Sequence, residues 1–249
     1  KNICSFLNGI NDNRVRIIMN KRNMGLVWSL NYALKFVSGE YIARMDADDI
    51  CMSTRLEKQV AYLDSHPEVI ICGAQIEYFG TKSNKYVKLS FPTKDKILKE
   101  MLAFSTCFAH PTVMMRKDII VKNKLQYDYD YKNAEDYCMW INMISLGKFA
   151  NLDEALVKYR ISDAQVSQPY NLQTIKSVMA CRRKYLERYL SEDEIKDLFE
   201  SPIKVWTVKS IKQKISNPRV IEACYLSLER YSFCLLYTSP SPRDRTRSR

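Results

Sequence analysis

The fold of this chain is decided by one stretch of sequence, Gly39-Glu40-Tyr41-Ile42-Ala43-Arg44-Met45-Asp46-Ala47-Asp48-Asp49. Residues 40–45 are mainly apolar or aromatic, which predicts a buried strand. Three aspartates follow at once, so the strand ends in a cluster of carboxylates. In open α/β sheets, ligands bind outside the carboxyl ends of the strands. The stretch therefore predicts both a sheet and a binding site at its edge.

Regular elements on both sides of this stretch predict a doubly wound α/β fold. Residues 26–37 carry apolar side chains at helical spacing, and residues 53–65 form a second helical pattern. Strands are predicted at 15–19 and at 69–79. Strands alternating with helices are typical of a mostly parallel, Rossmann-like sheet with right-handed crossovers and flanking helices.

The second half of the chain is less regular but continues the alternation. The patterns predict strands at 87–89, 112–115 and 155–159, and helices at 93–103, 134–146, 171–190 and 191–200. Ser191 is followed three residues later by Glu194, which resembles a capping box and predicts the start of the last helix.

The composition of the 249 residues, 46% of them hydrophobic, is that of a globular protein. The eight cysteines form no C-x-x-C pair and are interpreted as small buried hydrophobes. The sequence contains neither an apolar run long enough to cross a membrane nor a signal-peptide pattern, which predicts a cytoplasmic protein. The net charge of +11 is scattered, which favours a solvated surface or peripheral contact with the inner face of the membrane over a nucleic-acid partner.

The acidic cluster offers hard oxygen ligands. Asp46 and Asp48 are two residues apart, so both can face one side of an extended or turning segment and bind Mg²⁺ or Mn²⁺. Such an ion commonly takes one or two carboxylates together with substrate phosphate, and it neutralises charge on a departing diphosphate. The alternative is that these acids only cap the helix that follows. A bare D-x-D pattern does not decide between the two.

Several ordered motifs resemble glycosyltransferase family 2, the inverting enzymes with the GT-A fold that use nucleotide-diphosphate sugars. The motifs span about residues 12 to 170 and are Asn23-Met24-Gly25-Leu26, the stretch 39–49, Arg55-Leu56-Glu57-Lys58-Gln59-Val60, His110-Pro111-Thr112, Ala134-Glu135-Asp136-Tyr137 and Tyr159-Arg160. The resemblance implies a metal-dependent transferase that moves a sugar to a hydroxyl group of a glycan or lipid-linked acceptor, in the synthesis of cell-surface polysaccharide.

The resemblance also implies roles for single residues. Asp48 is the expected metal ligand, and Asp46 is expected near the metal, the ribose and the diphosphate of the donor. Asp136 is the expected general base, with Glu135 as its neighbour or substitute. The alternative for these two acids is that they only complement the positive end of the helix that they begin.

Four more residues are candidates for contact with the nucleotide sugar. Asn23 and Gly25 could approach the nucleotide, although turn formation explains them nearly as well. Arg160 could pair with the diphosphate or form a surface ion pair. His110 is interpreted first as a structural, hydrogen-bonded histidine and second as a substrate contact.

The expected organisation has three parts. Residues 1–170 form the GT-A domain, residues 171–233 a C-terminal helical extension, and residues 234–249 a non-native tail rich in Ser, Pro and Arg. The nucleoside-binding strands with which family members begin are absent, which predicts a start inside the domain. Two other functions remain open: another Mg²⁺-dependent nucleotidyl or phosphoryl transferase, and a basic membrane-binding or nucleic-acid-binding module without catalysis.

Overall fold

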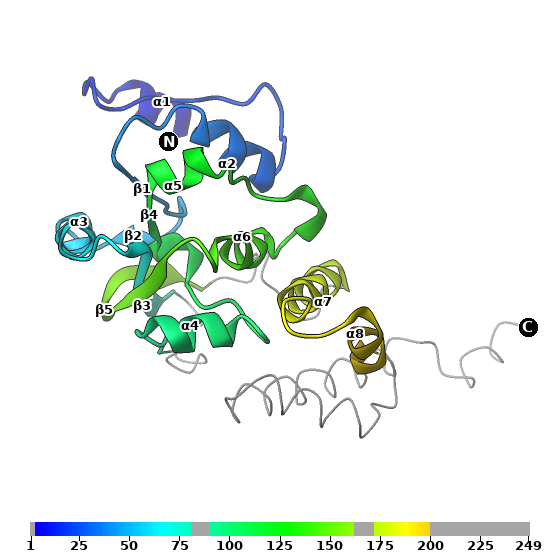
Figure 1. The fold of residues 1–249 in the computed structure, drawn as a ribbon. Helices are drawn as coiled ribbons and strands as arrows, with labels where there is room; N and C mark the ends of the chain where they lie inside the picture. The colour runs from blue at the N-terminus through cyan, green and yellow to red at the C-terminus, as the bar shows by residue number, and fades with distance from the viewer. Residues whose placement is uncertain (1–2, 81–89, 162–171, 200–249) are drawn as a thin grey trace, which may run out of the picture.

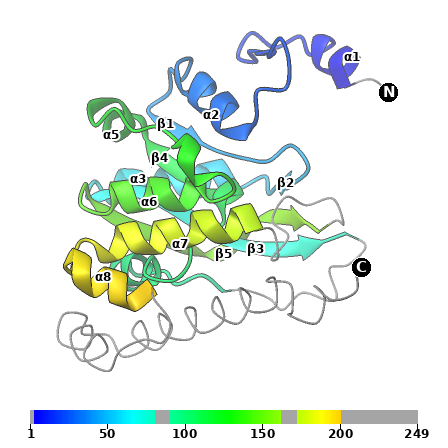
Figure 2. The same cartoon turned by 90° about the vertical axis from the view of Figure 1, so that its right-hand side faces the viewer.

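The computed structural model describes residues 3–80, 90–161 and 172–199. The strand predicted at 87–89, the tail at 234–249 and most of the predicted helical extension lie outside the described residues. Figure 1 shows the arrangement of the elements, and Figure 2 shows it from the side.

A five-stranded mixed sheet, in the order β1-β4-β3-β5-β2, forms the centre of the fold. The strands are β1 Tyr41–Ala43, β2 Ile50–Cys51, β3 Val69–Phe79, β4 Met114–Arg116 and β5 Lys148–Arg160. β3 and β5 pair in parallel, whereas β4 pairs antiparallel with both β1 and β3. β1, β3 and β5 therefore run in one direction, and the α/β fold class is confirmed. β2 pairs antiparallel with β5, so β2 and β4 run the opposite way.

Helices cover both faces of this sheet (Figure 1). Those described are α1 Ile3–Asn8, α2 Leu26–Leu34, α3 Arg55–Ser65, α4 Asp95–Met101, α5 Lys117–Lys122, α6 Glu135–Met143, α7 Leu172–Leu186 and α8 Glu192–Phe199, with the short 3-10 helices η2 His110–Thr112 and η3 Tyr129–Tyr131. α3 packs on one face through Leu63, beside Val69 and Cys72. α4 and α6 pack on the other face in the largest apolar cluster, which also includes Met179 and Leu186 of α7.

α7 lies along α6, as both views show (Figure 2). Because its apolar side chains share the core with α6, residues 172–186 are packed into the same folded body as the sheet. The capping box predicted before α8 is present: the backbone N–H of Ser191 donates to Glu194 Oε2 at 2.7 Å. A domain boundary at residue 170 stays a prediction.

The strand predicted at 15–19 is wrong. This segment pairs with no strand among the described residues, and its apolar side chains are exposed, with Val15 at 46% and Met19 at 70%. A strand needs a neighbour to take up its backbone hydrogen-bonding groups, and apolar composition alone cannot supply one.

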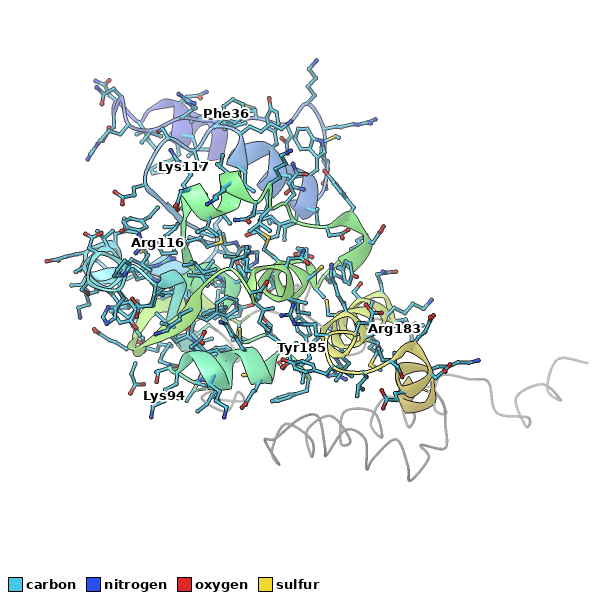
Figure 3. The ribbon with its side chains drawn as sticks, viewed as in Figure 1. Phe36, Lys94, Arg116, Lys117, Arg183 and Tyr185 are labelled. Atoms are coloured by element: carbon cyan, nitrogen blue, oxygen red, sulfur yellow. The ribbon has the colours of Figure 1, made fainter. Side chains whose placement is uncertain are left out.

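Arg116, labelled in Figure 3, ties α3 to the sheet. Its guanidinium donates to the carbonyl oxygen of Leu63 at 2.6 Å and to that of Val69 at 2.9 Å. These carbonyls belong to the last turn of α3 and to the start of β3, so one side chain fixes the connection between them. Backbone oxygens at a helix end otherwise lack partners.

Gly73 on β3 provides a test of the packing between the sheet and η2. A Cβ atom at this position would collide with Asn151 Oδ1 and would lie 2.7 Å from Phe108 Cδ1. We expect Gly73→Ala to lower the free energy of unfolding by about 1–3 kcal/mol, because overpacking forces these buried neighbours to shift. Chemical denaturation measures the change. Gly9→Ala is the control, since its Cβ would meet no atom nearer than 3.4 Å. An equal effect of both substitutions would contradict the prediction.

Candidate functional site

The acidic loop, residues 44–49, crosses the carboxyl ends of the strands. It leaves β1 at one edge of the sheet and enters β2 at the opposite edge. The backbone N–H of Arg44 donates to Val113 O at 3.0 Å, and that of Asp49 donates to Asp46 O at 3.4 Å. The carboxylates are thus held on a tight turn above the end of the sheet, where open α/β sheets bind ligands.

Two buried polar residues of α3, Arg55 and Gln59, hold the start of the acidic loop in place. The Arg55 side chain, 1% exposed, donates to Arg44 O at 2.8 Å and to Gln59 Oε1 at 2.9 Å. Gln59 donates in turn to Thr112 O at 2.8 Å. Burial lowers the pKa of Arg55 from its usual value. The pair therefore joins α3 to the acidic loop and to the segment before β4, and breaking it would leave buried groups without partners.

Asp46 is held by Arg44. The Arg44 guanidinium donates from Nη1 and Nη2 to the two carboxylate oxygens of Asp46, each at 2.5 Å. The Arg44 side chain is only 9% exposed, whereas that of Asp46 is 35% exposed. Such a bidentate pair fixes both groups. The carboxylate of Asp46 is thus already engaged, and its predicted contact with a metal stays a prediction.

Asp48 and Asp49 occupy different environments. Asp48 is exposed, and its backbone carbonyl accepts from Arg160 Nε at 2.8 Å. Asp49 Oδ1 accepts from the backbone N–H of Arg160 at 2.9 Å. Asp49 Oδ2 is buried without a hydrogen-bond partner among the described residues. Burial raises the pKa of Asp49, and the charges of Asp46 and Asp48 add to this effect.

Arg160 lies at the acidic loop. It is the last residue of β5, and its guanidinium also lies over the ring of Phe79, 4.5 Å from the centroid. The contacts of Arg160 with Asp48 and Asp49 join the two segments that form this end of the sheet. Its contact with a diphosphate stays a prediction.

Asp136 and Glu135 begin α6, as predicted. Asp136 is half-buried and Glu135 is 6% exposed. Burial raises the pKa of Asp136 to about 6, and the neighbouring charge of Glu135 adds to the rise. The backbone N–H of Tyr137 and the positive charge of Arg44 act in the opposite direction. Arg44 is therefore close enough to act electrostatically on Asp136 while it holds Asp46.

His110 is a packed, hydrogen-bonded residue. Its Nε2 lies 3.1 Å from the hydroxyl oxygen of Tyr127, and its ring packs edge-on against Trp140. Burial holds the pKa of His110 well below its usual value, and the charge of Arg44 adds to this effect, so His110 is neutral at pH 7. These contacts are those expected of a structural, hydrogen-bonded histidine. Contact of His110 with a substrate stays a prediction.

Asn23 and Gly25 lie before α2. Gly25 has φ 81° and ψ 169°, a region that is essentially restricted to glycine. Its N–H donates to Asn23 Oδ1 at 3.0 Å, and its carbonyl oxygen accepts from Ser29 Oγ at 2.8 Å. These hydrogen bonds join Gly25 only to Asn23 and Ser29. Among the described residues, no hydrogen bond connects Asn23 or Gly25 to the acidic loop. Their contact with the nucleotide stays a prediction.

Sequence reasoning did not identify two positioning residues. Asn31 exchanges two hydrogen bonds of 2.8 Å with the backbone of Tyr127 and thereby fixes α2 to the loop that carries the partner of His110. Arg44 was noted only as part of the strand. Asn31 is a polar residue inside the apolar helical pattern of residues 26–37, which was the available signal, whereas the pairing of Arg44 depends on the turn after β1.

A small pocket of about 160 Å³ adjoins Asp136 on the side of α7. It is lined by Phe104, Ser105, Thr106, Asn133, Ala134, Asp136, Tyr137, Val178 and Arg182. Asp136 thus borders a space for a small molecule and is also within electrostatic reach of Arg44 in the acidic loop.

Among the described residues, no group of three or more His, Cys, Asp or Glu side chains is placed to hold a metal ion. None of the described helices is both long and apolar enough to cross a membrane.

The chain is similar in sequence to known glycosyltransferases. The family described as glycosyl transferase family 2 matches residues 1–123. An uncharacterised glycosyltransferase of Haemophilus influenzae is 32% identical over 236 residues, which cover 90% of this chain and 72% of that protein. The O-antigen biosynthesis glycosyltransferase WbnJ of Escherichia coli is 34% identical over 74% of this chain and 70% of its own length.

These matches define a transferase of the glycosyltransferase class. The chain belongs to glycosyltransferase family 2. The crystal structure of S. aureus TarS, residues 1–349, resembles it in fold, with a TM-score of 0.50 and 16% identity over 87% of this chain and 71% of TarS.

The pKa of Asp136 gives a stability test that does not depend on activity. A carboxyl group whose pKa is raised in the folded protein stabilises the fold fully below its unfolded value near 4, and this contribution is lost as the pH rises through about 6. The melting temperature of Asp136→Asn minus that of the parent is the quantity to compare. We expect this difference to be more positive at pH 8, where the parent carries a buried charge, than at pH 4.5. Differential scanning fluorimetry measures it. Asp130→Asn, at an exposed position, is the control, and parallel pH profiles for parent and Asp136→Asn would refute the assignment.

Proposed function

We propose that this chain transfers a sugar, with inversion, from a nucleotide-diphosphate sugar to a hydroxyl group of a glycan or lipid-linked acceptor, with Asp136 as the general base. The observation that carries the proposal is the position of Asp136, which borders the pocket and is also within electrostatic reach of Arg44, the partner of Asp46. Family membership supports the reaction class.

The raised pKa of Asp136 suits a base. With a pKa of about 6 the carboxylate is ionised at neutral pH and is more basic than an ordinary aspartate. The acceptor hydroxyl would give its proton to Asp136 while its oxygen forms a bond to the anomeric carbon. The bond from that carbon to the diphosphate oxygen breaks, and its electron pair leaves with the nucleoside diphosphate. Attack on the face opposite the leaving group inverts the anomeric centre.

The acidic loop suits a hard divalent cation. Asp48 supplies an exposed carboxylate, and Asp49 Oδ2 is a buried oxygen without a described partner. Oxygen donors of this kind match Mg²⁺ or Mn²⁺, which retain open positions for phosphate. Asp48 would be the direct ligand, and Asp46 would help to hold the donor from its fixed place beside Arg44. A bound cation would neutralise charge on the leaving diphosphate.

The acceptor class follows from relatives and charge. WbnJ is named for O-antigen biosynthesis, which supports a growing surface glycan as the acceptor. Peripheral binding to the inner face of the membrane, favoured by the net charge of +11, would bring a lipid-linked acceptor to the site.

Substitution of the base tests the chemistry. We expect Asp136→Asn to reduce kcat by about 10²–10⁴-fold, because the proton of the hydroxyl group then has no acceptor in the site. In the parent protein, kcat/KM should rise with pH and level off above an apparent pKa of about 6. Transfer of radiolabelled sugar from UDP- and GDP-hexoses provides the measurement. If Asp136→Asn kept full activity while Glu135→Gln lost it, the base would be Glu135.

Removal of divalent ions tests the acidic loop. We expect EDTA to abolish transfer, and Mn²⁺ or Mg²⁺ to restore it to the parent but not to Asp48→Asn, because that variant lacks the proposed ligand. Asp153→Asn on β5, also at an exposed position, is the matched control and should be restored fully. Transfer that persists in EDTA would remove the metal from the proposal.

A further inference from the structure

Two cysteines that are far apart in the sequence meet where α7 packs on α6. Cys138 is on α6 and Cys181 is on α7, two helices that lie side by side (Figure 2), and both residues are 0% exposed. Cys181 Sγ lies 3.7 Å from the carbonyl oxygen of Ala134, which also accepts from the backbone N–H of Cys138 at 3.0 Å. A side-chain hydrogen bond joins the two thiols directly. The two sulfur atoms are therefore neighbours in the folded chain.

A cation belongs to the same cluster. Lys184 of α7 places its Nζ 3.5 Å from Cys138 Sγ and 5.2 Å from the ring centroid of Tyr131. Asn142 Nδ2 donates toward the same sulfur at 3.9 Å. A positive charge and hydrogen-bond donors around a sulfur atom favour its thiolate form. The side chain of Lys184 is only partly buried, so it connects this buried sulfur to the surface.

The pKa values of the two thiols are shifted in opposite directions. The hydrogen bond with Cys181 and the charge of Lys184 lower the pKa of Cys138, although burial acts against them. The same hydrogen bond, together with burial, raises the pKa of Cys181. Cys138 is therefore the thiol that ionises first, and the thiolate is the nucleophilic form of cysteine.

We infer that Cys138 and Cys181 form a site of reversible oxidation, at which a small hydroperoxide produces a disulfide bond between α6 and α7. The inference goes beyond sugar transfer and does not depend on it. In the reduced protein, packing alone holds the two helices together at this point, whereas in the oxidised protein a covalent bond joins them.

The reaction balances with hydrogen peroxide as the oxidant. The Cys138 thiolate attacks one peroxide oxygen, the O–O bond breaks, and Cys138 becomes a sulfenic acid while the second oxygen leaves as hydroxide. The sulfur of Cys181 then attacks Cys138 Sγ, and the S–O bond breaks. The departing hydroxide takes up the proton of the Cys181 thiol, and the first hydroxide takes up the proton that Cys138 released. Two thiols thus lose two electrons, and one peroxide becomes two water molecules.

Burial determines which oxidant reaches the pair. Both side chains are fully covered, so a reagent must enter through small local openings of the structure. Hydrogen peroxide is little larger than water, whereas glutathione disulfide contains two tripeptides. Cys51, by contrast, is exposed on β2 and is available to reagents of either size. The site is therefore selective for small oxidants.

The disulfide bond would act on the helix that carries Asp136. Cys138 follows Asp136 in α6, and Val178 of α7 lines the pocket beside Asp136. The bond would also close a long loop of chain that contains the whole of β5, Lys148–Arg160. Closing a long loop removes many conformations from the unfolded chain, so oxidation should stabilise the fold.

Peptide mapping tests the linkage in the parent protein. The reduced full chain is treated with hydrogen peroxide, the remaining thiols are blocked with N-ethylmaleimide in denaturant, and the digest is analysed by mass spectrometry without reduction. We expect a linked pair of peptides that contain Cys138 and Cys181 and that dithiothreitol separates. Glutathione disulfide should modify Cys51 and leave Cys138 and Cys181 unlinked. Absence of the linked pair after peroxide, or oxidation of Cys138 to a sulfinic acid without linkage, would overturn the inference.

Thermal unfolding tests its consequence. We expect dithiothreitol to lower the melting temperature of the peroxide-treated parent by roughly 5 °C or more, because the disulfide closes a long loop. Cys138→Ala and Cys181→Ala should show no such change. Cys107→Ala, which removes another fully buried thiol, is the matched control and should behave as the parent. An equal response to dithiothreitol in all four proteins, or no response in the parent, would count against the disulfide. If either variant fails to fold, the peptide map of the parent decides.

Discussion

The site depends on one buried guanidinium, that of Arg44. It sits immediately after β1, pairs with both oxygens of Asp46 and influences the pKa of Asp136 and of His110. A positive charge favours the ionised form of a carboxyl group near it, so Arg44 acts on Asp46 by direct contact and on Asp136 through its charge.

Arg44 is in turn positioned by α3. Arg55 donates to its backbone carbonyl, and Gln59 holds the neighbouring segment through Thr112. Within the sequence motif from Arg55 to Gln59, these two end residues are buried and join a helix to the end of the sheet, whereas Leu56 and Glu57 between them are exposed. Buried polar groups of this kind are favourable only when each has a partner, which ties the geometry of the acidic loop to the folding of α3.

Much of the fold could be predicted from local patterns. α2, α3, α4, α6, α7 and α8 lie where apolar spacing placed them, because each buries one face in the core. β5 begins earlier than expected: Asp153 and Glu154 interrupt its alternation at an irregularity in the pairing, between Leu152 and Ala155. The strand prediction at 15–19 was wrong because, although the segment has an apolar pattern, no described strand lies beside it to pair with.

By itself the sequence determined which chemical groups the site contains and in what order: three aspartates after a strand, two acids at the start of a helix and an arginine at the end of a strand. These depend on short-range pattern and motif, which a single chain displays directly. Tertiary structure alone decided that Arg55 of α3 holds the backbone of Arg44, that Asp136 becomes more basic through burial, and that Val178 and Arg182 of α7 line the pocket. Pairing, burial and pocket shape arise from contacts between segments far apart in the sequence, which no local pattern records.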